Sequence, residues 1–238
     1  MMGKEPRAVA RFDMYVLVHK GLRAFMSDTL SLLGRTDWSD EHDALVATAQ
    51  LRKLMETCFK HLQHEDEFIH AAMEARRPGS AGDTLLDHVE HVMAIKAFLA
   101  DAQELELLPI PLRQPLASEV YKRLAVFVGE NFQHMAHEEA HNNGVLWAAY
   151  SDAELIEIHD RLVASIPPQE MGIVMRWMLP YANTHERAML LGDMKSKAPA
   201  EAFDAVLDML RPLVSRADWG KLMKALGIPA TVRSTVPA

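Results

Sequence analysis

The amino-acid sequence predicts an all-α protein, an up-down-up-down four-helix bundle followed by a C-terminal helical extension. Apolar residues recur at helical spacing nearly everywhere, and no long run alternates with period two. Only 7% of the 238 residues are aromatic, whereas Ala, Leu, Met, Glu and Lys are plentiful, which favours helix. Short connections join four long amphipathic segments, so the segments are expected to be antiparallel neighbours.

The four bundle helices are expected over residues 12–33, 40–75, 83–108 and 115–150. Gly34 is a stop signal for the first helix, and Ser39 or Asp40 can cap the second. The chain between Ile110 and Gln114 is expected to be irregular, with Pro115 in the first turn of the fourth helix.

A capping box, Ser151-x-x-Glu154, predicts that a further helix begins directly after the bundle. Shorter helices are expected over residues 169–179, 184–195, 200–213 and 216–226, and Gly227 suits a C-terminal cap. The predicted domains are therefore a bundle over 10–150, a helical extension over 151–227 and a flexible tail over 228–238.

Charge and composition exclude several classes of function. The formal net charge is −8, with 33 acidic and 25 basic residues and no basic stripe, so no nucleic-acid partner is expected. No apolar run approaches the ~20 residues of a membrane span, and no signal-peptide core is present, so we expect a cytoplasmic protein. The single cysteine, Cys58, excludes disulfide frameworks, Cys-based zinc sites and iron–sulfur clusters.

The 12 histidines are unevenly distributed, and two of the expected helices carry the same string. Both strings read His-x-x-His-Glu, one from His61 to Glu65 and the other from His134 to Glu138. Residues i and i+4 share one helix face, so each first histidine can point at the same place as its glutamate. Both strings lie mid-helix beside apolar residues such as Phe59 and Phe132, which argues against solvated faces.

The other two helices add His19 and the pair His88 and His91. Each of the four helices can therefore send an imidazole inward, and two also send a carboxylate. Two divalent ions that share bridging carboxylates would use such a set. Imidazole and carboxylate without thiolate suit iron, manganese or zinc. The candidate ligands are His19, His61, Glu65, His88, His91, His134 and Glu138.

Several neighbouring polar residues receive other interpretations. His64 and His137 are expected outside the ligand set, and Asp66, Asp87, Glu90 or Glu139 can accept the second N–H of a ligating imidazole. Tyr15, one turn before His19, can lie over the site, although ordinary packing is the simpler interpretation. The remaining candidates for structural or exposed roles are His42, His70, His159 and His185.

Over residues 10–150 this pattern resembles the hemerythrin-like, or His-His-Glu cation-binding, domain family. The resemblance implies a diiron centre with an oxo or hydroxo bridge and an open position for O₂, NO or peroxide. It implies two iron ions as cofactor, with zinc or manganese as alternatives. Glu65 and Glu138 would bridge the metals, and the histidines would supply terminal nitrogens.

The departures from the oxygen carriers are informative. The third helix has His-x-x-His and the fourth has His-x-x-x-Glu, which resembles the mixed His/Glu subgroup and favours redox, sensing or iron-handling roles over O₂ storage. His88 and His91 compete for one ligand position, and the Glu90-His91 pair favours His91.

Three kinds of function follow as hypotheses. The first is a module that binds or senses O₂, NO or the iron level. The second is an enzyme of peroxide or NO reduction or of iron-centre repair. The third is a metal-stabilised structural or partner-binding protein, in which the C-terminal helices, with their Met171, Met175 and Met178 stripe, cover the bundle or form a homodimer.

Overall fold

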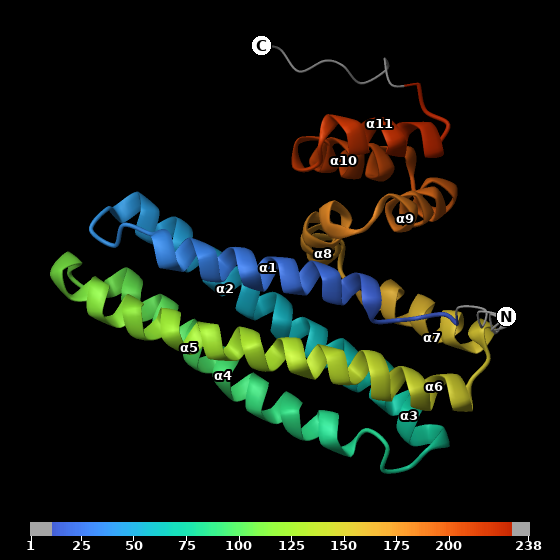
Figure 1. The fold of residues 1–238 in the computed structure, drawn as a ribbon, viewed down its shortest axis with the longest axis horizontal. Coiled ribbons are helices and arrows are strands. Elements are labelled where there is room, and N and C mark those ends of the chain that lie inside the picture. The colour runs from blue at the N-terminus through green and yellow to red at the C-terminus, as the bar shows by residue number, and fades with distance from the viewer. Residues whose placement is uncertain (1–10, 230–238) are drawn as a thin grey trace, which may run out of the picture. The chain divides into compact units, whose positions relative to one another are not determined.

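The computed structural model describes residues 11–229, and its helices follow one another as labelled in Figure 1. Within these residues every regular element is a helix and no strand occurs, which confirms the all-α prediction. No helix in this part of the chain is long and apolar enough to cross a membrane. Of the predicted tail, 228–238, all but the first two residues lie outside the described part.

The chain divides into two compact units. Within the described part, the first unit comprises residues 11–16 and Asp37–Ile166, and the second comprises Leu17–Thr36 and residues 167–229. This division differs from the predicted boundary at residue 150. Helix α7 contacts the π-helical segment η1 and belongs to the first unit, whereas the segment Leu17–Thr36 is grouped with the C-terminal helices.

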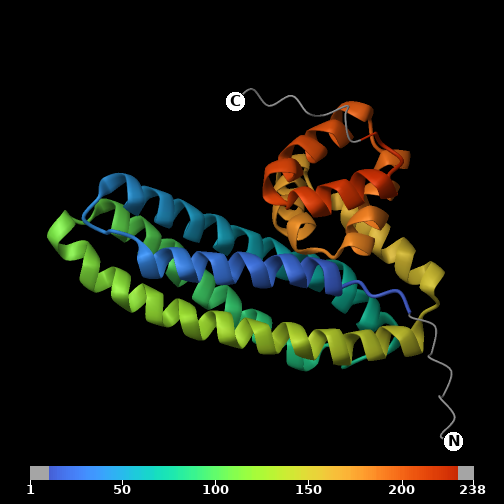
Figure 2. The ribbon, with the colours of Figure 1, turned by 45° about the horizontal axis from the view of Figure 1, so that its top comes forward.

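Two long helical rods and helix α4 form the body of the first unit. The first rod consists of α2 (Glu41–His64), the π-helical segment η1 (Glu65–His70) and α3 (Ala71–Arg76). The second consists of α5 (Ile110–His137), the π-helical segment η2 (Glu138–Asn142) and α6 (Asn143–Ala149). Helix α4 (Gly82–Leu107) packs along α2 and α5, and α7 (Asp152–Ser165) completes the unit (Figure 2).

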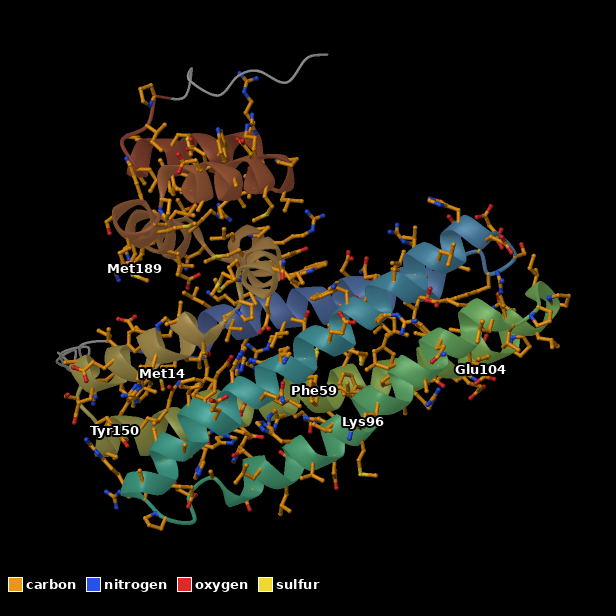
Figure 3. The ribbon with its side chains drawn as sticks, turned by 180° about the vertical axis from the view of Figure 1, so that it is seen from behind. Met14, Phe59, Lys96, Glu104, Tyr150 and Met189 are labelled. Atoms are coloured by element: carbon orange, nitrogen blue, oxygen red, sulfur yellow. The ribbon has the colours of Figure 1, made fainter. Side chains whose placement is uncertain are left out.

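Apolar side chains at helical spacing hold these elements together. Fully buried residues of α2, α4 and α5 include Leu51, Leu54, Met55, Ile95, Leu105 and Leu124. Near the π-helical segments a second apolar cluster joins Tyr15, Ile69, Met73, Leu146, Leu155 and Ile158. The side chains that fill the space between α2 and α4 are visible in Figure 3.

The prediction of an irregular segment between Ile110 and Gln114 is wrong, because α5 already begins at Ile110. Pro111 occupies the first turn, where a missing N–H leaves no intrahelical bond unmade. Pro115 removes only the bond to the Pro111 carbonyl, so the helix continues through it. The Nε of Arg113 donates to the Leu108 carbonyl at 2.9 Å and stabilises the turn between α4 and α5.

The start of the first predicted helix differs from the structure, whereas the start of the fifth agrees with it. Helix α1 (Val16–Arg35) begins later than predicted, because Asp13 Oδ1 accepts from the backbone N–H groups of Tyr15 and Val16. The capping box at the start of α7 is confirmed, since Ser151 and Glu154 bond each other's backbone N–H groups.

In the second unit the segment Leu17–Thr36, nearly all of α1, packs on helix α8 (Pro168–Tyr181). The Phe25 ring stacks on Trp177 with centroids 4.1 Å apart, and Lys20 Nζ lies 2.6 Å from Glu186 Oε1. The helix predicted as the first of the bundle is thus grouped with the C-terminal helices, through contacts that hydrophobic periodicity does not encode.

The remaining helices of the second unit share one apolar core. They are α9 (Thr184–Lys197), α10 (Ala200–Leu210), a 3₁₀ turn (Arg211–Leu213) and α11 (Arg216–Ala225). Leu179, Leu191, Leu207 and Leu222 are fully buried among them. Gly227 has φ +65° and ends α11 with a bond from the Ile228 N–H to the Met223 carbonyl, as the predicted cap requires.

Candidate metal centre

Two buried glutamates mark the site, and each is the first residue of a π-helical segment. Glu65 begins η1 and is 2% exposed, and Glu138 begins η2 and is 0% exposed. One turn earlier in each rod a histidine faces its glutamate. His61 Nε2 lies 3.1 Å from Glu65 Oε1, and His134 Nε2 lies 3.4 Å from Glu138 Oε2. The shared helix face predicted for each His-x-x-x-Glu pair is therefore present.

Helix α4 brings His88 to the same place. Its Nε2 lies 3.1 Å from His134 Nε2, and 3.6 Å from both Glu65 Oε2 and Glu138 Oε1. Glu65, His88, His134 and Glu138 each offer a donor atom within 4.8 Å of the others, and all four residues are buried. Three separate stretches of chain thus converge on one point.

These separations fit ligands of one cation. Metal–nitrogen and metal–oxygen bonds of about 2.0–2.2 Å place two ligand atoms about 3 Å apart at a right angle and about 3.5 Å apart at a tetrahedral angle. The contacts of His88 with His134 and with the two glutamates lie between 3.1 and 3.6 Å. The donor set can therefore hold a divalent ion without a large rearrangement.

The protons of the imidazoles support the same conclusion. His88 Nδ1 lies 2.7 Å from Asp66 Oδ1, and His134 Nδ1 lies 3.1 Å from Asp87 Oδ2. A carboxylate only accepts, so each Nδ1 carries the proton and donates. Each Nε2 then directs a lone pair at the other, beside two carboxylates, and a positive charge is needed between them. Metal-bound histidines commonly have such an outer carboxylate, and Asp66 and Asp87 were expected as acceptors.

The pKa values of His88 and Asp66 are shifted by the hydrogen bonds and buried carboxylates around them. Burial lowers the pKa of His88, but hydrogen bonds to Asp66 and Glu138 and the charges of both buried glutamates raise it to about 10. Burial also opposes the charged form of Asp66, yet the hydrogen bonds from His70 and His88 outweigh it and lower the pKa of that carboxyl. The centre therefore favours a cation, whether a proton or a metal ion.

The two carboxylate oxygens of Glu65 face different imidazoles. Its Oε1 faces His61, whereas its Oε2 faces His88. His61, Glu65 and Glu138 also offer donor atoms within 4.8 Å of one another. Both groups could hold a metal ion, and both contain Glu65 and Glu138.

The structure brings His88 to the donors, whereas the sequence favours His91, whose ligation stays a prediction. His91 is buried, with its ring centroid 4.9 Å from that of His134 and 5.8 Å from that of Phe127. It belongs to none of the donor groups found among residues 11–229. Burial and the neighbouring His134 and His88 lower its pKa to about 4, so its ring stays neutral.

His19 is fully buried in α1, which belongs to the second unit, and its ligation stays a prediction. Tyr15, in the first unit, is also fully buried and accepts a hydrogen bond from Asn142 Nδ2 at 3.0 Å. Burial and the charges of Glu138 and Glu65 raise the pKa of its phenol, so Tyr15 lies close to the carboxylates and stays protonated.

The sequence predicts a structural or exposed role for His70, but the structure groups it with Asp66 and His88 as potential donors. His70 is 2% exposed and stands five residues after Glu65, a spacing that only a π-helical turn brings to one face. The strings alone gave no indication of such a turn.

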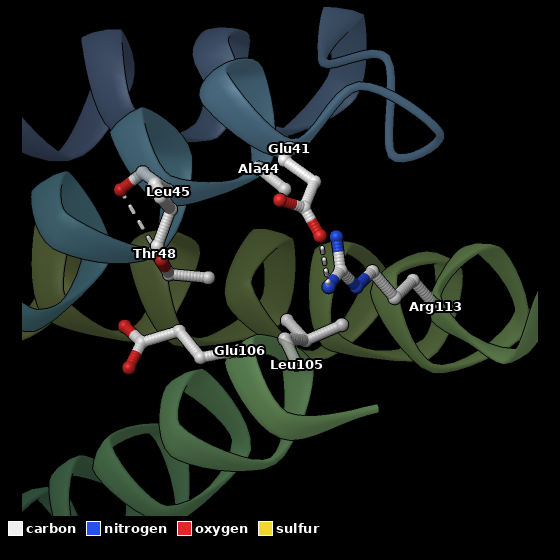
Figure 4. Close-up of a pocket in the computed structure, with 7 residues that line it drawn as sticks. All are labelled: Glu41, Ala44, Leu45, Thr48, Leu105, Glu106 and Arg113. Atoms are coloured by element: carbon white, nitrogen blue, oxygen red, sulfur yellow. Dashed lines mark hydrogen bonds and ion pairs between the residues drawn. The ribbon is translucent and has the colours of Figure 1, made fainter. Parts of the chain in front are cut away.

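A pocket elsewhere in the first unit carries no comparable chemistry. It lies beside the turn between α4 and α5 and is lined by residues such as Leu45, Leu105 and Arg113 (Figure 4). Its ion pair, Arg113 Nη2 to Glu41 Oε1 at 3.8 Å, involves an exposed glutamate. No His/Glu donor group reaches it within the described residues.

No protein-family model matches the chain, and neither a curated protein nor a solved structure matches it. The residues themselves therefore carry the functional argument: a buried set of imidazoles and carboxylates that can hold a metal ion.

Proposed function

We propose that the chain is a hemerythrin-like non-haem diiron protein that binds or reacts with O₂, NO or peroxide. The observation that carries the proposal is the convergence of Glu65, His88, His134 and Glu138 in the interior of the first unit. Nitrogen and carboxylate ligands without thiolate suit iron, with manganese or zinc as alternatives. The arrangement of Glu65 between two imidazoles supports two ions over one.

The sequence pattern extends this proposal to α1. We propose that α1, α2, α4 and α5 are the four helices of an up-down bundle and that His19 is a further ligand. The buried histidine in α1 is the observation in favour. If His19 is a ligand, His19→Ala lowers the metal content of the purified protein.

The chain's own residues would each have a stated task. Bound iron would supply redox chemistry and an open coordination position for a small ligand. Glu65 and Glu138 provide the negative charge that retains the ions, and Asp66 and Asp87 hold the proton on Nδ1 of His88 and His134 so that each Nε2 stays available. Tyr15 keeps a protonated hydroxyl beside the carboxylates.

The experiment is metal content per chain in aerobically purified protein, read with its near-ultraviolet and visible spectrum. We expect about two irons and charge-transfer bands, and at least a tenfold loss of affinity in His134→Ala. His137→Ala is the matched control, because this exposed histidine stands in the same string and makes none of the contacts of the site. Equal metal content in both variants would refute the proposal.

Acidification gives a second check. Ligating imidazoles must be neutral and ligating carboxylates charged, so metal content should fall between about pH 7.5 and about pH 5. Metal content that stays constant over this range would contradict a histidine-rich site. Turnover of peroxide or NO by the iron-loaded protein would indicate an enzyme, and binding without turnover would indicate a sensor or carrier.

A further inference from the structure

One ring nitrogen of His70 contacts the carboxylate of Asp66, and the other faces the buried carboxylate of Glu138. Its Nδ1 lies 3.0 Å from Asp66 Oδ1. Its Nε2 lies 3.8 Å from Glu138 Oε1 and 3.3 Å from Thr84 Oγ1. The residue is 2% exposed, so neither nitrogen relies on bulk water.

The groups that surround His70 Nε2 are all hydrogen-bond acceptors. The Thr84 hydroxyl donates its single proton to the Ala81 carbonyl at 3.0 Å, so it offers His70 a lone pair. The Glu138 carboxylate is also an acceptor. With the imidazole proton on Nδ1, held by Asp66, Nε2 directs its own lone pair into this set, and a cation, either a second proton or a metal ion, fits at Nε2.

His88 stands in the same relation to Asp66. One oxygen, Asp66 Oδ1, accepts from Nδ1 of His70 and of His88, and the two ring centroids lie 4.9 Å apart. Both Nε2 atoms face Glu138 Oε1, at 3.8 Å and 3.6 Å. Asp66 thus fixes two imidazoles in parallel roles, and one of them already belongs to the donor group of the centre.

We infer that His70 is a further metal ligand through Nε2, next to Glu138 and His88, and that Asp66 is the positioning residue for both imidazoles. This inference rests on the proposed metal centre. It adds a nitrogen ligand that neither the His-x-x-His-Glu strings nor the resemblance includes.

An alternative is a separate cation among Asp66, His70 Nδ1 and His88 Nδ1. The distances favour hydrogen bonds instead. Asp66 Oδ1 lies 2.7 Å from His88 Nδ1, which suits a charge-assisted bond and is shorter than the about 3 Å expected for two ligands at a right angle on one metal. The Asp66 side chain is also 44% exposed, as expected for an outer acceptor.

The test uses Co(II)-loaded protein and the exchangeable imidazole N–H signals that a paramagnetic ion shifts in the proton NMR spectrum. We expect His70→Ala to lose one shifted N–H signal and at least tenfold in Co(II) affinity. Asp66→Asn should move two shifted signals, those of His70 and His88. The control is His42→Ala, an exposed histidine in the first turn of α2.

The outcomes separate this inference from the proposed centre. If Co(II) binding depends on Glu138 but His70→Ala keeps every shifted signal and its affinity, the inference about His70 fails and the centre stands. If His70→Ala loses only a second, weaker Co(II), the separate outer site is correct and the inference fails. If the wild-type protein takes up no Co(II), both fail. If His70→Ala does not fold, Asp66→Asn, a substitution at a half-exposed position, decides instead. Movement of both shifted N–H signals supports the inference, and movement of the His88 signal alone refutes it.

Discussion

Glu65 and Glu138 occupy equivalent positions in two different rods: each begins a π-helical segment four residues after a histidine that faces it. A π turn inserts a residue into a helix and is often found at functional sites. Here it occurs twice at the same point of the same string. The local repeat in the sequence is therefore also a repeat in backbone structure, centred on the carboxylates that the proposed metals would share.

The first prediction concerns Glu138→Gln. Glu138 is a buried carboxylate that faces His88 Nε2 beside Glu65, so the wild type can use it to hold a cation and the variant cannot. With excess Co(II), the wild type should gain several kcal/mol, about 4 at a thousand times the dissociation constant, and the variant should gain little. Thermal unfolding with and without Co(II) measures both differences.

A matched control separates this loss of Co(II)-dependent stabilisation from a general effect of charge. Glu130 is exposed on the same helix, α5, so Glu130→Gln changes the net charge equally and should leave the Co(II)-dependent gain intact. An equal gain in Glu138→Gln would show that this carboxylate does not hold the ion.

The two His-x-x-x-Glu pairs of the site could be predicted from the sequence, because residues four apart share one face of an α-helix. His61 with Glu65 and His134 with Glu138 stand four residues apart, on one face. His70 could not be found in this way, because residues five apart point about 140° away from each other in an α-helix. Only the π-helical turn from Glu65 brings His70 back to the site.

The choice between His88 and His91 depended on the rotation of α4. Residues three apart share a broad face, so either could point inward. Asp66, on the neighbouring rod, accepts from His88 Nδ1 at 2.7 Å, and this contact across helices holds His88 with its Nε2 toward His134 and the glutamates. A pattern within one helix contains no information on it.

The positions of the long helices could be predicted from hydrophobic periodicity, but the way the helices group could not. The long helices and the caps at Ser151 and Gly227 agree with the structure. The start of α5 at Ile110, five residues before Pro115, differs from the prediction, because a proline is compatible with the first turn of a helix as well as with its boundary. The grouping of α1 with α8 depends on side-chain fit, such as Phe25 on Trp177, which a single sequence does not reveal.

The second prediction tests that fit through two glycines of the second unit. A Cβ on Gly21 would lie 3.0 Å from Met178 Cα and 3.1 Å from its backbone N, so Gly21→Ala must separate α1 from α8. We expect a loss of about 1–3 kcal/mol in the free energy of unfolding. In Gly192→Ala, inside α9, the new methyl meets nothing within 4 Å, and we expect a gain of about 0.5–1 kcal/mol. Urea unfolding should show shifts of opposite sign, and a neutral Gly21→Ala would contradict the close contact.

The third prediction concerns Cys58. Burial raises the pKa of its thiol to about 12, so almost no thiolate exists at neutral pH and no reagent can reach the sulfur. An aromatic disulfide reagent should label one thiol per chain in urea and none in the folded protein. As a control, Ala125→Cys places a thiol on the exposed face of α5 and should react quickly without denaturant. Fast labelling of the folded wild type would show that α2 opens at this point.

The last prediction is the pH dependence of the ion pair between Arg76 and Glu154. Arg76 Nη2 donates to Glu154 Oε1 at 2.6 Å, and this bond, with those from Ser151, lowers the pKa of the carboxyl to about 2. The unfolded chain, with an ordinary carboxyl pKa near 4.5, binds more protons between these values. The pair therefore stabilises the fold above about pH 4.5, and that stability is lost as the pH falls toward 2.

Arg76→Ala should lower Tm by no more than a few degrees at about pH 6, because both partners are partly exposed. Arg77→Ala is the control, since it removes the same charge from the next, exposed position. The Tm difference between the two variants should shrink as the pH is lowered from about 6 to about 2.5 at low salt, because protonated Glu154 no longer distinguishes them. A difference that stays constant over this range would assign the effect to the other contacts of Arg76, its bond to the Ala149 carbonyl and its stacking on Tyr150, which do not titrate there.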